Sequence, residues 1–237
     1  YADWMFCLVR TTVEDIPQKG ISFVLIDMTS PGVTVKPIIT LDQPAVGFQE
    51  INMVYLENVE VPKTNLIGEE GKGWTYAKYL LEFERGNAYS PALKGALDGM
   101  RRMVEQDFSD AKTSSTKKIL SDKINVLNIE VLALEYTELR ILGALAAGEN
   151  VGPESSMLKT RGTELQQSVT ELCTEIVGME GLALDQGTPA DGDNFQPVGR
   201  KEGNGVMQDY FNTRKVSIYA GSNEIQRNIM SKMVLGL

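Results

Sequence analysis

The sequence predicts an α+β protein, in which part of a β-domain is followed by an antiparallel bundle of long helices. Three observations lead to this prediction. The first third of the 237 residues alternates short apolar segments with turn signals. Residues 61–73 form a glycine-punctuated passage, and beyond them apolar residues recur at three-to-four spacing. We therefore expect residues 1–68 to be the end of a β-domain and residues 69–237 to be a helical bundle domain.

The β-rich part contains four expected strands. Segments rich in Phe, Val, Leu and Ile mark them, and proline and glycine turn signals separate them. The expected strands are Trp4–Thr11, Ile21–Met28, Thr34–Ile39 and Ile51–Leu56. A complete sandwich or barrel usually has more strands, so we expect this sheet to be the end of something larger.

The helical part begins with a helix expected from about Trp74 to Met103, distorted at Pro91 because proline removes a backbone hydrogen bond. A second helix is expected over about residues 117–147 and a third over about residues 153–178. The last helical stretch breaks before Ser222, which is a candidate cap for a final helix. Four or five long helices with short connections are typical of an antiparallel bundle.

Composition excludes several classes of function. The formal net charge of −9 argues against a nucleic-acid partner, because phosphate binding needs a basic surface. No apolar run approaches the length of a membrane span, and we expect no signal peptide. We expect Cys7 and Cys173, which stand in apolar surroundings far apart in sequence, to be reduced core residues of a cytoplasmic protein.

The chain contains no histidine. This excludes a Ser-His-Asp or Cys-His nucleophile, a histidine general base and nearly all histidine-containing metal sites. Proton chemistry must therefore use a carboxylate, a lysine, a tyrosine or a thiol, and a carboxylate is the commonest of these.

Three separated segments together resemble the acyl-CoA dehydrogenase family. Residues 29–35 and 61–74 are similar to the passage from the family's middle β-domain to its C-terminal bundle, Leu80–Arg85 to its first bundle helix, and Ile218–Ile229 to its C-terminal signature. The resemblance covers nearly the whole chain and implies a four-helix bundle of acyl-CoA dehydrogenase type. The family's N-terminal helical domain and first β-domain strands, which carry flavin-binding segments, are expected to precede Tyr1.

The resemblance implies an FAD-dependent reaction. Such enzymes convert an acyl-CoA thioester to a trans-2-enoyl-CoA: a glutamate takes the α-proton while the β-hydrogen leaves as hydride to the flavin. The implied partners are an acyl-CoA substrate, an electron-transfer acceptor and further subunits, in a homo- or hetero-oligomer that is a dimer or a tetramer.

The position of the base distinguishes this chain from many family members. They carry the glutamate just before the Gly-Ser/Thr pair of the signature, where this chain has Ala220. Alanine accepts no proton, but the resemblance assigns its backbone N–H to the thioester carbonyl. Other members place the glutamate on the first bundle helix, before an arginine, and Glu84-Arg85 matches that arrangement.

Helical spacing separates Glu84 from its neighbour Glu82. The residues three and four positions from Glu84 are mostly apolar, whereas those of Glu82 include two cations, Lys78 and Arg85. Glu84 is therefore the predicted base, held against the core, and Glu82 a charge-paired surface residue. The alternative is that both are solvated, as most helix glutamates are.

The resemblance also implies contacts of the signature with cofactor and substrate. Ser222 and Glu224 occupy positions where the family contacts the flavin, while Arg85, Tyr219 and Gly221 occupy substrate-binding positions. The alternative roles of the first two are structural: Ser222 as a helix cap, and Glu224 as a favourable acid in the first helical turn.

Two departures concern FAD held across a subunit interface. Relatives have an Arg-x-x-Phe-Gly run that residues 103–118 lack, and Gln-Ile-Leu-Gly-Gly where this chain has Glu175–Met179. The simpler interpretation of Glu175–Met179 is a helix end near Gly178. A chain that has the base Glu84 but lacks these two elements resembles the subunits of bacterial heteromeric acyl-CoA dehydrogenases. The alternative is a non-catalytic subunit that oligomerises with an active partner.

Overall fold

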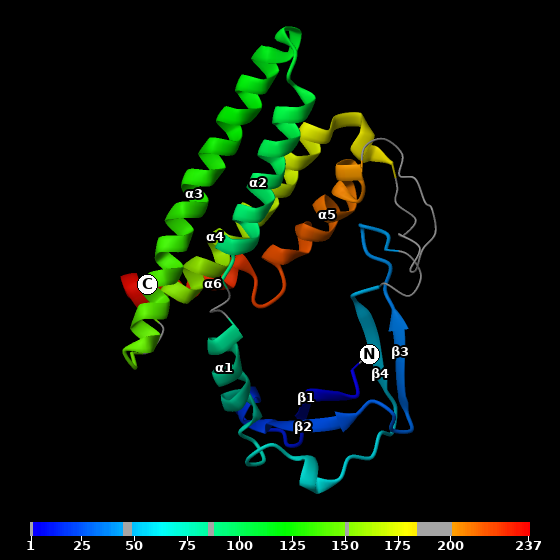
Figure 1. The fold of residues 1–237 in the computed structure, drawn as a ribbon. Coiled ribbons are helices and arrows are strands. Elements are labelled where there is room, and N and C mark those ends of the chain that lie inside the picture. Colours follow the sequence, from blue (N-terminus) through cyan, green and yellow to red (C-terminus); the bar gives the residue numbers. More distant parts are fainter. Residues whose placement is uncertain (1, 45–48, 85–87, 150–151, 184–200) are drawn as a thin grey trace. The chain divides into compact units, whose positions relative to one another are not determined.

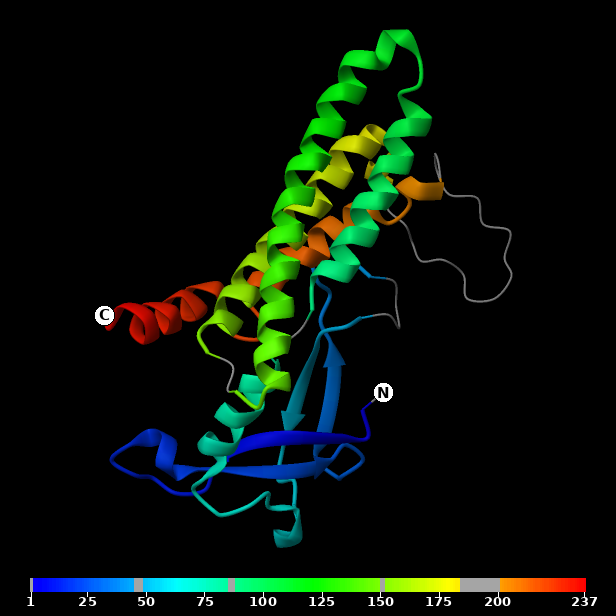
Figure 2. The same cartoon turned by 60° about the vertical axis from the view of Figure 1, so that its left-hand side comes forward.

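A computed structural model describes residues 2–44, 49–84, 88–149, 152–183 and 201–237 (Figures 1 and 2). They form two compact units. The first comprises Tyr1–Ile38 with Gln49–Glu84, and the second Ile39–Phe48 with Arg85–Leu237. The division by compactness falls after Glu84, and the domain boundary expected between residues 68 and 69 stays a prediction. The predicted α+β fold class is confirmed: strands occupy the first unit and a helical bundle the second.

The first unit contains the four predicted strands, each within two residues of its expected ends. Strand β1 (Trp4–Arg10) pairs antiparallel with β2 (Ile21–Asp27), in a register that sets Trp4 opposite Asp27. Strand β3 (Val33–Pro37) pairs antiparallel with β4 (Asn52–Leu56). Within the described residues these are two separate two-stranded sheets. The side chains of β1 alternate between exposed and half-buried, and its exposed face presents Trp4, Phe6 and Leu8.

Helix α1 (Gly73–Glu84) packs on β2, and the glycine-punctuated passage brings it there. The hydroxyl of Ser22 on β2 accepts a hydrogen bond of 2.9 Å from the backbone N–H of Gly71. A Cβ atom on Gly73 would lie 2.5 Å from the carbonyl carbon of Ser22, so only glycine allows this close approach. The passage is thus a tightly packed connection.

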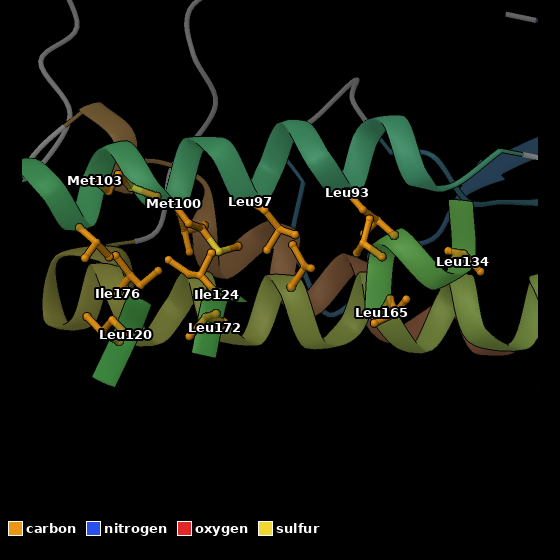
Figure 3. Packing of buried hydrophobic residues seen from close by; sticks show 14 of the residues in the cluster. Leu93, Leu97, Met100, Met103, Leu120, Ile124, Leu134, Leu165, Leu172 and Ile176 are labelled. Atoms are coloured by element: carbon orange, nitrogen blue, oxygen red, sulfur yellow. The ribbon is translucent and has the colours of Figure 1, made fainter. Parts of the chain in front are cut away.

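The second unit is built on three long helices, α2 (Ser90–Asp107), α3 (Ser114–Ala146) and α4 (Glu154–Val177). Figure 3 shows their leucine, isoleucine and methionine side chains meeting in one core. Residues three and four apart on each helix supply it, because they share one helical face. Its fully buried members include Leu97, Met100, Ile124, Val131 and Leu158.

The prediction of one continuous helix from Trp74 to Met103 is wrong, because α1 ends at Glu84 and α2 begins at Ser90. Pro91 stands in the first turn of α2, where no backbone hydrogen bond is lost. The carboxylate of Glu138 on α3 caps this turn: it accepts hydrogen bonds from the N–H groups of Tyr89 (2.6 Å) and Ser90 (3.1 Å) and from the Ser90 hydroxyl. The cap therefore fixes where α2 starts.

The chain ends with α5 (Val206–Asn212), a 3-10 turn (Thr213–Ser217) and α6 (Asn223–Met230), which continues as a π-helical turn to Leu235. Cys7 and Cys173 are free and half-buried, and burial raises the pKa of both thiols. Across the described ranges, no helix combines the length and apolar character needed to span a bilayer.

Candidate functional site

The C-terminal signature forms a tight turn in front of α6. Ala220 and Gly221 both have left-handed backbone conformations, with φ of 53° and 82°. A Cβ atom on Gly221 would lie 2.5 Å from the amide nitrogen of Gln226, so this position requires glycine. The hydroxyl of Ser222 then accepts a hydrogen bond of 3.4 Å from the backbone N–H of Ile225 and caps α6, as predicted.

A buried polar contact with α4 holds this turn in place. The ammonium group of Lys159 donates a hydrogen bond of 2.9 Å to the side-chain carbonyl of Asn223, the first residue of α6. The Asn223 amide in turn donates to the Thr163 hydroxyl at 3.1 Å. Lys159 is only 2% exposed, and this burial lowers its pKa, although the nearby charge of Glu224 opposes the effect. The turn is thus fastened to the helical core by a buried cation.

Glu224 lies on the exposed side of the same turn. A hydrogen bond from its own backbone N–H, followed by one from the Ser222 hydroxyl, lowers the pKa of its carboxyl. Arg227 and Lys159 add smaller effects in the same direction. Glu224 is therefore a stable anion in the first turn of α6, where the helix dipole also favours negative charge.

The segment before the turn is anchored to α4 as well. The side-chain amide of Gln167 donates to the carbonyls of Thr213 and Arg214, each at 3.3 Å. The Arg214 guanidinium donates back to the Gln167 carbonyl at 3.0 Å and stacks over the Tyr210 ring, 4.2 Å from its centroid. This anchoring leads the chain to Tyr219. Burial raises the pKa of the Tyr89 phenol, and smaller electrostatic effects of Tyr219 and Glu138 raise it further. Tyr219 therefore lies near the start of α2.

The end of α4 is occupied by protein contacts. Lys123 on α3 donates a hydrogen bond of 2.5 Å to the Glu175 carboxylate. The helix ends at Val177, and Gly178 follows with a left-handed φ of 61°, while Met179 is exposed. The interpretation of this stretch as a helix end is confirmed.

These features accompany a clear family relationship. A family model described as "Acyl-CoA dehydrogenase, C-terminal domain" matches residues 71–235, more than half of the chain. The chain belongs to the acyl-CoA dehydrogenase family. Acyl-CoA dehydrogenase IpdE1 of Mycobacterium tuberculosis is 27% identical over 242 aligned residues, which cover 100% of this chain and 56% of that protein.

Solved structures with an acyl-CoA dehydrogenase fold match this chain over its full length. The match to the "ChsE4-ChsE5 complex from Mycobacterium tuberculosis" has a TM-score of 0.75 at 24% identity, and this chain covers 58% of the matched chain. The match to the "Tcur3481-Tcur3483 steroid ACAD" has a TM-score of 0.75 at 22% identity, and this chain covers 57% of the matched chain. The chain therefore spans about half the length of the relatives it matches.

Five of the predicted site residues lie together in this acyl-CoA dehydrogenase chain. Tyr219, Ala220, Gly221, Ser222 and Glu224 form the turn and the start of α6. Glu84 is the last residue of α1 and belongs to the first unit. Arg85 lies outside the described residues. Their roles in catalysis and binding stay predictions.

Sequence reasoning missed Lys159, Thr163 and Asn223, which hold the turn. Their contacts join residues 60 and 64 positions apart, so no local pattern could reveal them. One signal was available: Ser156, Lys159 and Thr163 recur at three-to-four spacing on α4, and such a polar row on a buried helix face predicts polar partners across it.

Proposed function

We propose that this chain is the base-bearing C-terminal part of an FAD-dependent acyl-CoA dehydrogenase, which converts an acyl-CoA thioester to a trans-2-enoyl-CoA. Support comes from the family relationship together with the geometry of the signature turn. Because the chain covers about half of its relatives' length, the activity is proposed for the complete enzyme. An electron-transfer acceptor and further subunits complete the proposed assembly.

The observation that carries the proposal is the backbone of Ala220. It is exposed, its φ is 53°, and within the described part of the chain its N–H donates no hydrogen bond. A left-handed alanine is strained by roughly 1–2 kcal/mol, so the surrounding contacts must hold it. We propose that this N–H donates to the thioester carbonyl, which stabilises the negative charge that develops there as the α-proton leaves.

Glu84 is the proposed base. Glu84 is the last residue of α1. It would take the α-proton while the C–H electron pair forms the new double bond and the β-hydrogen departs with its own pair. Arg85, Tyr219 and Gly221 are proposed to contact the substrate. In this proposal the Glu84 side chain accepts the α-proton, because alanine has no group that accepts one, and the Ala220 backbone N–H binds the thioester carbonyl.

The described residues fit part of a flavin site. Ser222 carries a half-buried hydroxyl at the start of α6, and the neighbouring Gly221 and Glu224 are exposed, which suits contact with a polar ring system. The end of α4 fits a pyrophosphate poorly, because Glu175 is anionic and already paired with Lys123. When FAD is bound it supplies the hydride acceptor. We propose that Ser222 and Glu224 meet the cofactor and that other parts of the enzyme hold most of it.

The test is a Glu84→Gln variant of the complete enzyme with its partner subunits. The amide keeps the shape of the side chain and still forms hydrogen bonds, but it accepts no proton. Anaerobic flavin reduction by a panel of acyl-CoA thioesters should slow by about 100- to 10,000-fold, while flavin content and acyl-CoA binding stay nearly unchanged.

Glu82→Gln is the matched control, two residues earlier on the same helix. The sequence predicts Glu82 to be a charge-paired surface residue, so this change should have little effect, since an exposed ion pair contributes at most about 1 kcal/mol. If Glu84→Gln reduced its flavin at a near-normal rate, the base would lie elsewhere and the proposal would be wrong.

The second candidate function is a non-catalytic subunit. The ion pair of Glu175 with Lys123 favours it, because this pair occupies the end of α4 where relatives carry a neutral glutamine. A native complex whose flavin content matches only the partner subunits would support it, and so would an unchanged rate after Glu84→Gln. One flavin for every copy of this chain, together with a large rate loss in that variant, would exclude it.

A further inference from the structure

The interface between α4 and α6 is polar, although it is buried. Helix α4 contributes Ser156, Lys159 and Thr163 to it, and α6 contributes Asn223 and Gln226, each at most 4% exposed. Two of its polar atoms, the Ser156 Oγ and the Gln226 Oε1, have no hydrogen-bond partner among the described residues. Buried polar groups cost stability unless each is paired, and apolar side chains of similar volume often hold helices together better. Stability therefore does not explain this interface.

Lys159 lies in the interface without a carboxylate partner. Within the described residues it forms no ion pair, whereas Arg161, two positions later, pairs with Glu130 and Glu164 at 2.7 Å each. The Lys159 ammonium group instead donates its hydrogen bond of 2.9 Å to the neutral side chain of Asn223. A buried charge is compensated best by an opposite charge. The described contact of this ammonium group therefore fixes Asn223 and leaves the charge uncompensated.

Asn223 is held at two points. Its side-chain carbonyl accepts from Lys159, and its side-chain amide donates to the Thr163 hydroxyl at 3.1 Å, about one turn further along α4. Ala220 stands three positions before Asn223, and both Ala220 and Gly221 have left-handed backbone conformations. So short a segment has little freedom, and a shift of Asn223 must change the direction of the Ala220 N–H.

We propose that Lys159 is a positioning residue of the dehydrogenation: through Asn223 it keeps the Ala220 N–H directed at the thioester carbonyl. This inference rests on the proposed function. The N–H stabilises the negative charge that develops on the carbonyl oxygen as the α-proton leaves, so its direction matters most in the transition state. Loss of the ammonium group should therefore slow the chemical step and leave acyl-CoA binding, to which the rest of the ligand contributes most, nearly unchanged.

Lys159→Met in the complete enzyme with its partner subunits is the test. Methionine is unbranched and uncharged, and Asn223 keeps its contacts with Thr163, so we expect the variant to fold. The limiting rate of anaerobic flavin reduction by the best acyl-CoA of a panel should fall by about 10- to 100-fold, because a small misplacement of a donor has an effect of this size. The half-saturating acyl-CoA concentration should change by less than about threefold.

Arg161→Met is the matched control, because it removes an exposed cation two positions later on the same helix. Its limiting rate should stay within about twofold of the wild-type rate. Thermal unfolding at neutral pH separates positioning from a structural role. Lys159→Met removes a buried charge, so it should be at least as stable as the wild type although it is slower. A parallel loss of stability and rate would overturn the proposal.

Infrared spectroscopy follows the proposed hydrogen bond itself. The trans-2-enoyl-CoA product of the same substrate, isotopically labelled at its thioester carbonyl, can bind the oxidised enzyme without being dehydrogenated again. Its carbonyl band should lie at a lower frequency on the wild type than in free solution, because the hydrogen bond weakens the C=O bond. The band should move back toward the free position in Lys159→Met and stay in place in Arg161→Met. An unmoved band in Lys159→Met would contradict the positioning role.

A double-mutant cycle tests the route through Asn223. Asn223→Ala alone should also slow flavin reduction, and Lys159→Met combined with Asn223→Ala should be no slower than the slower single variant, because both changes remove the same contact. Circular dichroism shows whether each variant is folded. Rate losses that multiply would show that Lys159 does not act through Asn223, and the inference would be wrong.

The wild-type enzyme separates this inference from the proposed function. If the wild type is active and folded Lys159→Met reduces its flavin at the same rate, only the positioning role is refuted. If the wild type reduces its flavin with no thioester of the panel, the proposed function is refuted, and the positioning role with it.

Discussion

Lys159 and Asn223 are joined by a hydrogen bond of 2.9 Å inside the interface of α4 and α6, although 64 positions separate them in the chain. Because Asn223 directly follows the Ser222 cap, this contact fixes the turn that contains Ala220. Nearly complete removal of a lysine from water is costly. The chain therefore places the buried Lys159, at a cost in stability, close to the Ala220 backbone N–H that is proposed to bind substrate.

This contact predicts a dependence of stability on pH. Burial lowers the pKa of Lys159, so between the folded and unfolded pKa values the unfolded chain binds more protons. The unfolding free energy contributed by this group must then rise with pH across that window, just below the ordinary lysine pKa. In urea unfolding at increasing alkaline pH, the free energy of unfolding of the wild type should rise relative to that of Lys159→Met. A constant difference between the two proteins would show that Lys159 titrates normally.

The cap on α2 predicts a large loss of stability. Glu138 is 5% exposed, and its removal leaves the N–H groups of Tyr89 and Ser90 without their acceptor. Glu138→Ala should therefore lower the free energy of unfolding by about 2–4 kcal/mol. Glu135→Ala on the same helix removes only a partly exposed ion pair with Lys94 and should cost at most about 1 kcal/mol. Equal losses in urea titrations of the two variants would contradict the capping role.

The signature turn predicts different responses to substitution at two neighbouring positions. Gly221→Ala places a methyl group at φ of 82° and against Gln226, which should destabilise the fold by about 1–2 kcal/mol. Ala220→Gly removes the strain of a left-handed alanine and should change stability by less than about 1 kcal/mol. Thermal unfolding of both variants checks this. A stabilised Gly221→Ala protein would show that the turn is not held as described.

Two glycines inside the long helices are also predicted to respond differently to substitution by alanine. A Cβ atom on Gly162 of α4 would lie 2.5 Å from the ring of Tyr89, so Gly162→Ala should cost about 1–3 kcal/mol through overpacking. Gly143 of α3 has open space around it, and Gly143→Ala should stabilise by up to about 1 kcal/mol through helix propensity. Denaturant midpoints measured side by side distinguish the two, and a gain at both positions would mean that Tyr89 moves freely.

Features encoded by neighbouring residues were predictable from sequence. The four strands and the Ser222 cap depend on local patterns, and the structure confirms them. Pro91 indicated a disturbance, but the position of the break depends on Glu138, which reaches Ser90 from another helix. The same limit applied to the site. Motifs identified the turn, whereas its attachment to Lys159 depends on how α4 and α6 pack.

The exposed face of β1 has a practical consequence for anyone producing this stretch of chain. Trp4, Phe6 and Leu8 lie side by side on a strand that, within the described residues, pairs only with β2. An apolar strand with an open edge is a template for further strands, so it promotes aggregation during synthesis. Recombinant expression of residues 1–237 alone should therefore favour inclusion bodies. A charge such as Phe6→Lys on that face should shift the product toward the soluble fraction.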